Sequence, residues 1–431
     1  MAGYMRNVKG WFKRCAKSST LSTLVVFASA NMVITIINGV VSLLQARLVS
    51  PEAIGAFQKY CIPTRYMSVL FILVVDGLHR QYPYLIGMGR KVEALAVAAM
   101  AKCWYLAATC IVCSLFLVLS IIALCHRDYI SVAGWFGQLV VSIQFAYGSF
   151  LQIIYRRSLE FKRLSYNGLW EAGVGVVLLS AVKAFGYYGL VIRASLMSIV
   201  RFFLDRKYVP EKIACKWDTK IFLSTASISL PLSVIGYINT AFLSATFSYM
   251  VLRYCGERSL GLIGMAMSFQ TVALLFNNSM VQIFSVKIAK TFGASDSVRK
   301  SFEAVIWPTV MSIAISILFA LALCIVIKPF VMFFLPKYAD TIPVVYVLAI
   351  GIPLSAAALP TIILRTALLY KTIYFIGLAK LGTVILYIIF MPKTITWFAT
   401  ALIVGDIVNI CLGYVCLCYH SSKDSTIGEK T

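Results

Sequence analysis

The sequence predicts an all-α, polytopic membrane protein with about twelve transmembrane helices in two six-helix bundles. Composition is the first observation: 61% of the 431 residues are hydrophobic, 13% are charged, and the mean hydropathy is +0.88. Soluble domains contain about 45–50% apolar and about 25% charged residues, so a soluble fold could not cover this much apolar surface. The spacing of the apolar runs and the distribution of Lys and Arg are the other two observations.

Apolar runs of spanning length recur along the chain, and short polar breaks separate them. A transmembrane helix needs about 20 mostly apolar residues. The predicted spans are 24–46, 58–80, 94–124, 132–154, 166–184, 188–205, 224–250, 261–286, 303–327, 341–364, 372–391 and 396–418. The connecting loops leave no room for a separate soluble domain.

The N-terminal segment reads "MAGYMRNVKGWFKRCAKSS" and is basic throughout. The apolar run after it is long enough to span a bilayer, so no cleavable signal peptide is expected. We expect this leader to lie as an amphipathic segment on anionic lipid headgroups.

Lys and Arg outside the predicted spans are divided unequally between the two sides. One side holds 25 of the 39 Lys and Arg residues, including Arg80 at the membrane edge, and the other holds eight, including Lys183 at the end of span 5. The richer side contains both chain ends and the loops 81–93, 155–165, 206–222, 287–302 and 365–371. Cytoplasmic loops carry an excess of positive charge, so both termini are predicted to be cytoplasmic. The net charge of +23 is thereby attributed to topology, and no nucleic-acid partner is expected.

The sequence contains no pattern typical of a metal centre or of nucleophilic catalysis. Its 12 Cys residues are scattered, mostly inside apolar runs, and its 3 His residues lie far apart. We therefore expect no metal, no cofactor and no catalytic residue, and we expect the cysteines to be small apolar fillers in helices.

The chain contains a weak internal repeat with an offset of 206 residues. Residues 47–55, "RLVSPEAIG", align without a gap with residues 253–261, "RYCGERSLG". The "SPE" in the first copy is typical of a helix start. The offset maps span 1 onto span 7, which predicts an N-terminal bundle, 1–208, and a C-terminal bundle, 209–431. An even number of spans per copy places the pseudo-two-fold axis along the membrane normal, with a cleft between the bundles.

Basic side chains inside the spans are the first candidate site residues. Each costs about 2.5–3.5 kcal/mol near the centre of a membrane helix. Arg65 lies about eight residues, or roughly 12 Å, inside span 2, too far for easy snorkelling. The basic residues expected to line the cavity and bind substrate are Arg65, Lys380, Arg193, Lys59 and Lys102. Snorkelling of Lys59 and Arg201 from span ends, and structural ion pairs, are the alternatives.

Acidic residues inside the spans are candidates for ion coupling or gating. The candidates are Asp76, Glu171 and Asp406, while Glu303 lies at a span edge, and Asp76 shares a helix face with Arg65. A salt bridge to Arg80 is the alternative role for Asp76. The outer-interface arginines Arg47 and Arg253, equivalent in the repeat, are also gating candidates.

Uncharged polar residues form stripes at helical spacing in equivalent spans of the two copies. The stripe of span 7 comprises Ser233, Tyr237, Thr240, Ser244 and Ser248. In spans 1 and 8, the residues expected to line the cavity are Asn31, Asn38, Gln45, Gln270 and Asn277. Helix packing is the alternative. A cavity with excess positive charge suits a phosphate or diphosphate headgroup.

Three segments resemble bacterial polysaccharide flippases of the Wzx type. They are "LLQARLVSPEAIGAFQKYCIP", "FFLPKYADTIPVVYVLAIGIPL" and "GYYGLVIRASLMSIVRFFL". These flippases belong to the multidrug/oligosaccharidyl-lipid/polysaccharide exporter superfamily, which also contains the MATE transporters. The resemblance implies a MATE-like fold in the bacterial cytoplasmic (inner) membrane and an alternating-access cycle coupled to H⁺ or Na⁺.

The resemblance also implies the cargo and the partners. The cargo is an undecaprenyl-pyrophosphate-linked oligosaccharide, an anionic polyprenyl diphosphate moved to the periplasmic leaflet. It would serve the assembly of O-antigen, capsule or exopolysaccharide, with membrane lipids and polysaccharide polymerase machinery as partners. The protein would then be no enzyme.

Two alternatives stay open. A MATE-like small-molecule exporter would need acids in the N-terminal bundle and an apolar cavity. A membrane-embedded glycan polymerase or acyltransferase would need a large periplasmic loop with clustered catalytic side chains.

Overall fold

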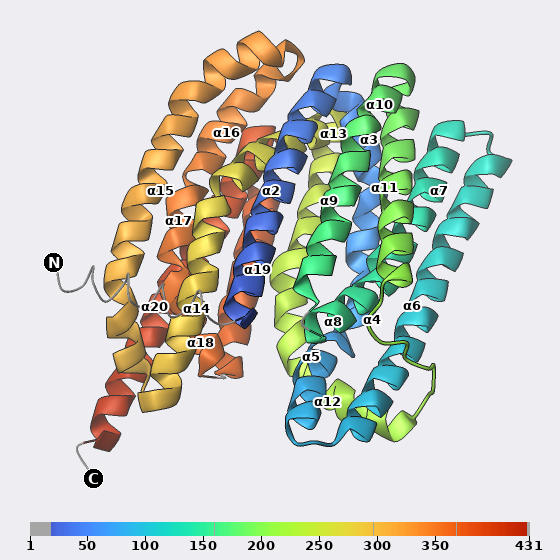
Figure 1. The fold of residues 1–431 in the computed structure, drawn as a ribbon. Helices are drawn as coiled ribbons and strands as arrows, with labels where there is room; N and C mark the ends of the chain where they lie inside the picture. The colour runs from blue at the N-terminus through green and yellow to red at the C-terminus, as the bar shows by residue number, and fades with distance from the viewer. Residues whose placement is uncertain (1–18, 159, 296, 368, 429–431) are drawn as a thin grey trace. The chain divides into compact units, whose positions relative to one another are not determined.

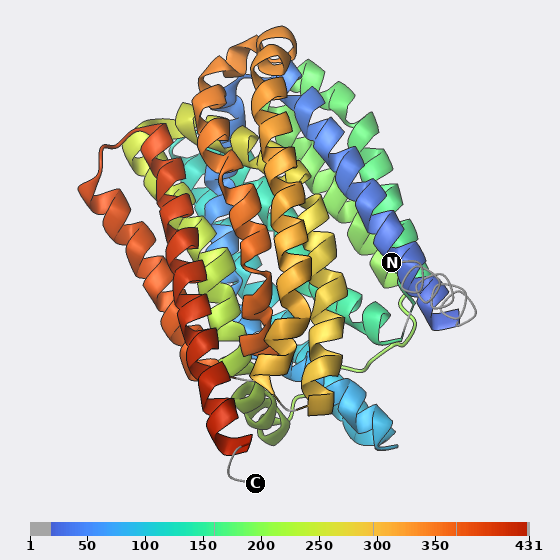
Figure 2. The ribbon, with the colours of Figure 1, turned by 90° about the vertical axis from the view of Figure 1, so that its left-hand side faces the viewer.

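A computed structural model describes residues 19–158, 160–295, 297–367 and 369–428. All regular elements in these ranges are helices, as the sequence predicts (Figures 1 and 2). The predicted amphipathic leader lies outside the described residues.

The first predicted hairpin forms where the "SPE" stretch ends one helix and starts the next. Helix α2 (Ser19–Leu48) is followed by α3 (Pro51–Met67), where the Ser50 side chain accepts a hydrogen bond from the Ala53 amide and Pro51 occupies the first turn. Such a cap satisfies an amide that the helix itself leaves without a partner.

Predicted span 2 is broken rather than continuous. It comprises α3, the short α4 (Val69–Ile72) and α5 (Val75–Gly87), and the chain bends by 43° between Pro51–Ile72 and Val75–Ile86. The predicted limits 58–80 therefore begin too late and miss the bend.

The rest of the first half follows the predicted order of spans. Its elements are α6 (Lys91–Cys125), α7 (Tyr129–Ile143), the π-helix η1 (Gln144–Gly148), α8 (Ser149–Arg157), α9 (Phe161–Val177), α10 (Leu179–Phe185) and α11 (Tyr187–Lys207).

The second half is also helical but more often interrupted. Its elements are α12 (Thr219–Tyr237), the π-helix η2 (Ile238–Phe242), α13 (Leu243–Ala273), α14 (Leu275–Ser295), α15 (Val298–Phe334), the 3₁₀-helix η3 (Pro336–Thr341), α16 (Ile342–Ala349), α17 (Gly351–Ala357), the 3₁₀-helix η4 (Leu359–Thr361), α18 (Ile362–Thr366), α19 (Tyr370–Phe390) and α20 (Ile395–Gly428).

Ten helices within the described ranges are long and apolar enough to cross a membrane, or eleven with the bent pair. One of them, Ser233–Ala273, has 41 residues. At 1.5 Å per residue it would be about 60 Å long, roughly twice the hydrocarbon thickness. Gly256, with φ 83°, breaks its helical backbone between predicted spans 7 and 8. With that break, the order of the helices follows the order of the predicted spans, as expected of a multi-pass membrane protein.

Contacts divide the chain into two compact units. Unit 1 contains the chain up to Gln45 and Leu73–Ser227, and unit 2 contains Ala46–Ile72 and Ile228–Thr431. Helix α3 therefore packs with the second half of the chain. The division of the bundles at residue 208 stays a prediction.

Each unit has its own apolar core. In unit 1, α7 lies between α6 and α11 (Figure 1), and Tyr105 and Phe116 of α6 are fully buried. In unit 2, α14, α15, α18, α19 and α20 share a buried cluster that includes Val305, Ile363 and Leu417. Figure 2 shows α19 beside α20.

Candidate functional site

Arg65 lies in the last turn of α3, and its partners are neutral. Its guanidinium donates to the hydroxyls of Ser244, at 2.9 Å, and Ser248, at 3.1 Å, both on α13. Within the described part of the chain, no carboxylate lies within ion-pair distance of Arg65. This half-buried guanidinium therefore keeps its charge available to an anion.

Three residues of the polar stripe predicted in span 7, Ser244, Ser248 and Tyr237, contact α3. Besides the two serines that accept from Arg65, the Tyr237 hydroxyl donates to the carbonyl oxygen of Tyr66, at 3.0 Å. The Tyr66 hydroxyl in turn donates to Thr246, at 3.0 Å. The stripe thus holds the end of α3 that carries Arg65.

Lys380 is paired with a second predicted site residue. Its ammonium lies 2.6 Å from the carboxylate of Asp406, which joins α19 to α20. The side chain of Lys380 is 18% exposed and that of Asp406 is 36% exposed. This contact is a structural ion pair, which is the alternative role for the basic residues inside the spans.

Arg193 joins three helices of unit 1. Its guanidinium donates to the side-chain oxygen of Gln45 on α2, at 2.8 Å, and to the carbonyl oxygen of Gly175 on α9, at 3.0 Å. The structure therefore brings two predicted cavity residues, Arg193 and Gln45, into direct contact.

A buried polar network surrounds Asp205, a residue that the sequence reasoning did not select. Asp205 is fully buried and pairs with Arg201 at 2.9 Å, and Arg201 also pairs with Glu171 at 3.1 Å. The amides of Asn167 and Gln144 donate to Asp205 at 2.9 and 3.2 Å. Two carboxylates thus share one guanidinium, which leaves the group with one excess negative charge. The four-residue spacing of Arg201 and Asp205 was the signal that could have identified this pair.

Lys59 lies beside a crossing of α3 and α13. Its ammonium pairs with Glu257 at 3.0 Å. Nearby, Arg258 pairs with Glu52 at 3.2 Å and with Asp340 at 3.0 Å. All five side chains are 39–64% exposed.

Two glycines allow the backbones of α3 and α13 to touch at this crossing. A Cβ atom added to Gly55 would overlap the carbonyl oxygen of Glu257, and one added to Gly261 would overlap the carbonyl oxygen of Pro51. Only glycine permits so close an approach. The repeat identified Gly55 and Gly261 but did not show that they meet.

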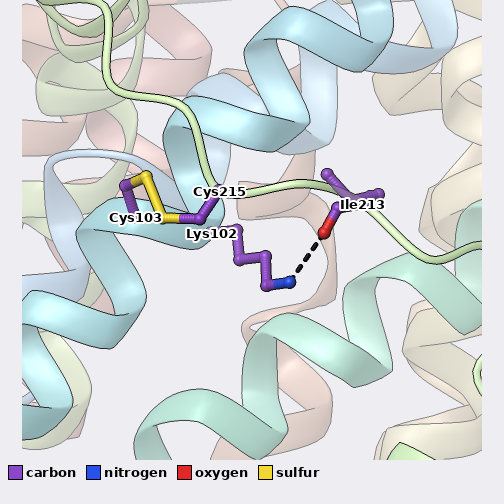
Figure 3. Close-up of a disulfide and its surroundings, with 4 residues drawn as sticks. All are labelled: Lys102, Cys103, Ile213 and Cys215. Atoms are coloured by element: carbon purple, nitrogen blue, oxygen red, sulfur yellow. Dashed lines mark hydrogen bonds between the residues drawn. A yellow bond between two sulfur atoms is a disulfide. The ribbon is translucent and has the colours of Figure 1, made fainter.

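Lys102 contacts the loop between α11 and α12 (Figure 3). Its ammonium donates to the carbonyl oxygen of Ile213, at 2.6 Å, and the next residue, Cys103, forms a disulfide with Cys215. The expectation that the cysteines are only apolar fillers is therefore wrong for this pair, because a loop cysteine lies against α6.

Three predicted cavity amides have other surroundings. Asn277 is 3% exposed, donates to Ile352 and Ser355, and accepts from Ser316. The Gln270 amide donates to the Leu348 carbonyl oxygen at 3.0 Å. These contacts of Asn277 and Gln270 are helix-packing contacts, which is the alternative role for the polar stripes. Asn38 on α2 is exposed.

The remaining candidates are Asn31, in the middle of α2, and three residues near helix ends or bends, Asp76, Arg47 and Arg253. The backbone oxygen of Asn31 accepts from Thr35, and Asp76 lies in the first turn of α5, after the bend. The side chains of Arg47 and Arg253 are exposed. Their roles, and the cavity itself, stay predictions.

No family model and no curated protein matches the sequence. Solved structures match almost the whole chain. The inward-facing conformation of a multidrug resistance MATE family transporter of the MOP superfamily has a TM-score of 0.71 at 13% identity, covering 93% of this chain and 98% of that chain. The outward-facing conformation has a TM-score of 0.64 at 12% identity, covering 95% and 98%.

A third similar structure is a MOP superfamily transporter from Pyrococcus furiosus, for which a binding pocket of reverse polarity is described. Its TM-score is 0.67 at 12% identity, and 95% of this chain and 97% of that chain are covered. The protein therefore has a MATE-like, all-α polytopic fold.

Proposed function

We propose that the protein is an alternating-access transporter, working as a MATE-like exporter of small molecules. The observation that carries this proposal is the fold. Nearly the whole chain matches both an inward-facing and an outward-facing transporter structure. The same architecture in two states supports a cycle in which a central site opens to each side in turn.

The α3–α13 crossing suits a contact that forms in one state and breaks in another. Its backbones meet at Gly55 and Gly261, where neither residue has a side chain. The ion pairs around it are partly exposed, and such pairs are each worth about 1 kcal/mol or less. A contact of this kind can close one end of the transport path and still separate.

Ion coupling is proposed at the network of Glu171, Arg201 and Asp205. Its excess negative charge would favour H⁺ or Na⁺, and the 33% exposed Glu171 is the member that an ion can reach. Binding of a cation there would neutralise the network and change the energy of any state in which it is dehydrated. The proposed location is the bacterial inner membrane with both termini cytoplasmic.

An anionic cargo is the second candidate, and Arg65 is the observation that favours it. A cation whose guanidinium donates to two serine hydroxyls, with no carboxylate at ion-pair distance among the described residues, can bind a phosphate or diphosphate, whereas it opposes a cationic drug. On this hypothesis the cargo is an undecaprenyl-pyrophosphate-linked oligosaccharide for surface polysaccharide assembly, handed to polymerase machinery.

The two cargo classes can be separated with purified protein in liposomes. One arm measures uptake of ethidium, a lipophilic cation, and the other measures flipping of a fluorescent polyprenyl diphosphate oligosaccharide. Ethidium transport that ceases with the ion gradient supports the exporter. Flipping of the diphosphate alone supports the second candidate. Transport of neither, by protein shown to be folded and inserted, would contradict both candidates.

A further inference from the structure

The loop between α11 and α12 is an extended strap docked on unit 1. We call residues 208–218 the strap. Four alternate residues of the strap, Glu211, Ile213, Cys215 and Trp217, contact the helices beside it. Ile213 does so through its backbone carbonyl oxygen, and the other three through their side chains.

The four contacts follow one another along the strap. The Tyr82 hydroxyl donates to Glu211 at 3.0 Å. Lys102 donates to the carbonyl oxygen of Ile213, and Cys103 is bonded to Cys215 with their Cα atoms 5.2 Å apart (Figure 3). The rings of Trp217 and Trp104 lie 6.5 Å apart. Three of the four partners are consecutive residues of α6.

The strap leads directly into α12, the helix in which the chain passes from unit 1 to unit 2. The chain passes from unit 1 to unit 2 between Ser227 and Ile228, inside α12. The first turns of α12 lie on unit 1, through Phe222 against Trp104 and a 2.9 Å hydrogen bond from Thr225 to Gln81. Beyond the passage, the Ser229 hydroxyl donates to the Ile72 carbonyl oxygen in unit 2.

The charge pattern predicts that this disulfide lies on the cytoplasmic side. The loop 206–222 contains Arg206, Lys207, Lys212, Lys216 and Lys220. Helix α6 has 35 residues, or about 50 Å, so part of it extends beyond a core of about 30 Å. Disulfides rarely persist in the cytosol, where those that form are mostly transient and redox-responsive.

We propose that Cys103 and Cys215 are a redox switch that locks the strap, and with it the first turns of α12, onto α6. The reduced form leaves the strap held only by its hydrogen bonds and ring contacts. The oxidised form fixes the strap covalently. The switch itself goes beyond the proposed function, and only its consequence, slower transport in the oxidised form, rests on it.

The chemistry is thiol–disulfide exchange with a small disulfide such as glutathione disulfide. The exposed Cys215 is the cysteine that an oxidant can reach. Its thiolate attacks one sulfur of the oxidant and releases one small thiol as leaving group. The Cys103 thiolate then attacks the mixed disulfide and releases the second. Two protein thiols lose two electrons in total, the oxidant gains them, and the two protons end on the two released thiols.

Hydrogen–deuterium exchange tests the switch without any knowledge of the substrate. The full-length protein in nanodiscs is compared after dithiothreitol and after glutathione disulfide. We expect amides of 208–227 to exchange about tenfold or more faster in the reduced form. Cys103→Ser and Cys215→Ser should exchange fast in both conditions. Cys110→Ser, which removes a free cysteine of the same helix, should behave like the wild type.

Thiol trapping in growing cells gives the second measurement. Both cysteines should be labelled by a maleimide before, and protected after, brief treatment with diamide. Equal exchange rates in the two redox forms would overturn the proposal. So would a disulfide that is already complete in unstressed cells, because it would then be a permanent crosslink.

The effect on transport separates this inference from the proposed function. With ethidium or the fluorescent diphosphate as probe, we expect transport to slow about fivefold or more on oxidation, and not in Cys103→Ser. If the hydrogen-exchange rate depends on the redox state but neither probe is transported, the switch is supported and the proposed function is contradicted. Equal transport rates with different exchange rates would contradict control of transport by the strap.

Discussion

Gly55 and Gly261 touch across a backbone crossing, and they are separated by 206 residues, the offset at which the two halves of the sequence align. Residues related by a two-fold axis contact each other only where they meet that axis. Glu52 and Arg258 have the same separation and also pair. Both contacts therefore join equivalent positions of the sequence repeat, and both copies have glycine where the backbones touch.

Replacing either glycine of the crossing should separate the two helices. Gly55→Ala and Gly261→Ala each place a methyl group against a carbonyl oxygen, so we expect a loss of about 1–3 kcal/mol in stability. Thermal unfolding in detergent measures it. Gly382→Ala in α19, where a Cβ meets nothing within 4 Å, is the control and should be neutral or slightly stabilising. Equal midpoints for all three variants would contradict the tight crossing.

Exchanging the charges of Lys59 and Glu257 tests whether their ion pair holds the crossing closed. Lys59→Glu and Glu257→Lys should each favour the open form, in which α3 and α13 separate at the crossing. The shift should be about 1 kcal/mol or less, which changes the ratio of open to closed protein up to about fivefold, because the pair is partly exposed. The double exchange should restore the wild-type ratio of open to closed protein. The ratio is measured by the accessibility of a cysteine introduced by Ala56→Cys. If the double variant is as open as either single one, the pair does not act as a latch.

Arg65 should govern an anionic cargo and be dispensable for a cationic one. Arg65→Ala should abolish flipping of the fluorescent polyprenyl diphosphate and, in cells, deplete surface polysaccharide while lipid-linked units accumulate in the cytoplasmic leaflet. Arg65→Lys should retain part of the activity, because an ammonium lacks the paired donors. Lys183→Ala, at an exposed helix end, is the control. Normal surface polymer in the Arg65→Ala strain would remove Arg65 from the mechanism.

The spans could be predicted from the sequence because apolar length is a local property. The helix start at Ser50 and the break at Gly256 are local too, and the repeat singled out Gly55 and Gly261. The partners of the intramembrane charges could not be predicted in this way. Periodicity predicts the helix face on which Lys380 lies. It does not predict that Asp406 of another helix pairs with Lys380.

Two residues were missed for identifiable physical reasons. Asp205 is the last residue of predicted span 6, and a carboxylate at a span end is ordinarily solvated. In the structure the neighbouring helices bury it fully. Cys215 lies in a loop 112 residues from Cys103, and no sequence pattern connects them.

The two acids that share Arg201 should respond differently to neutralisation. Asp205→Asn removes the fully buried partner of Arg201 and leaves only the partly exposed Glu171 as its counter-ion, so we expect a loss of about 3–5 kcal/mol in stability. Glu171→Gln leaves the Arg201–Asp205 pair intact and should be much less destabilising. Its expected effect is on coupling: transport driven by the ion gradient falls, while exchange of substrate without a gradient persists. Gradient-driven transport by Glu171→Gln at the wild-type rate would contradict the proposed coupling site.

Replacing Lys380 and Asp406 together separates a structural from a functional role for their ion pair. Lys380→Met or Asp406→Leu alone leaves one charge without its partner in a partly buried place, so each should lower stability by about 3 kcal/mol or more. The double variant should recover most of that loss, because neither charge then needs to be dehydrated. Stability is measured by thermal unfolding, and transport with both probes. If the recovered double variant transports neither probe, the pair acts in the cycle itself; if it transports like the wild type, the pair serves only to hold α19 against α20.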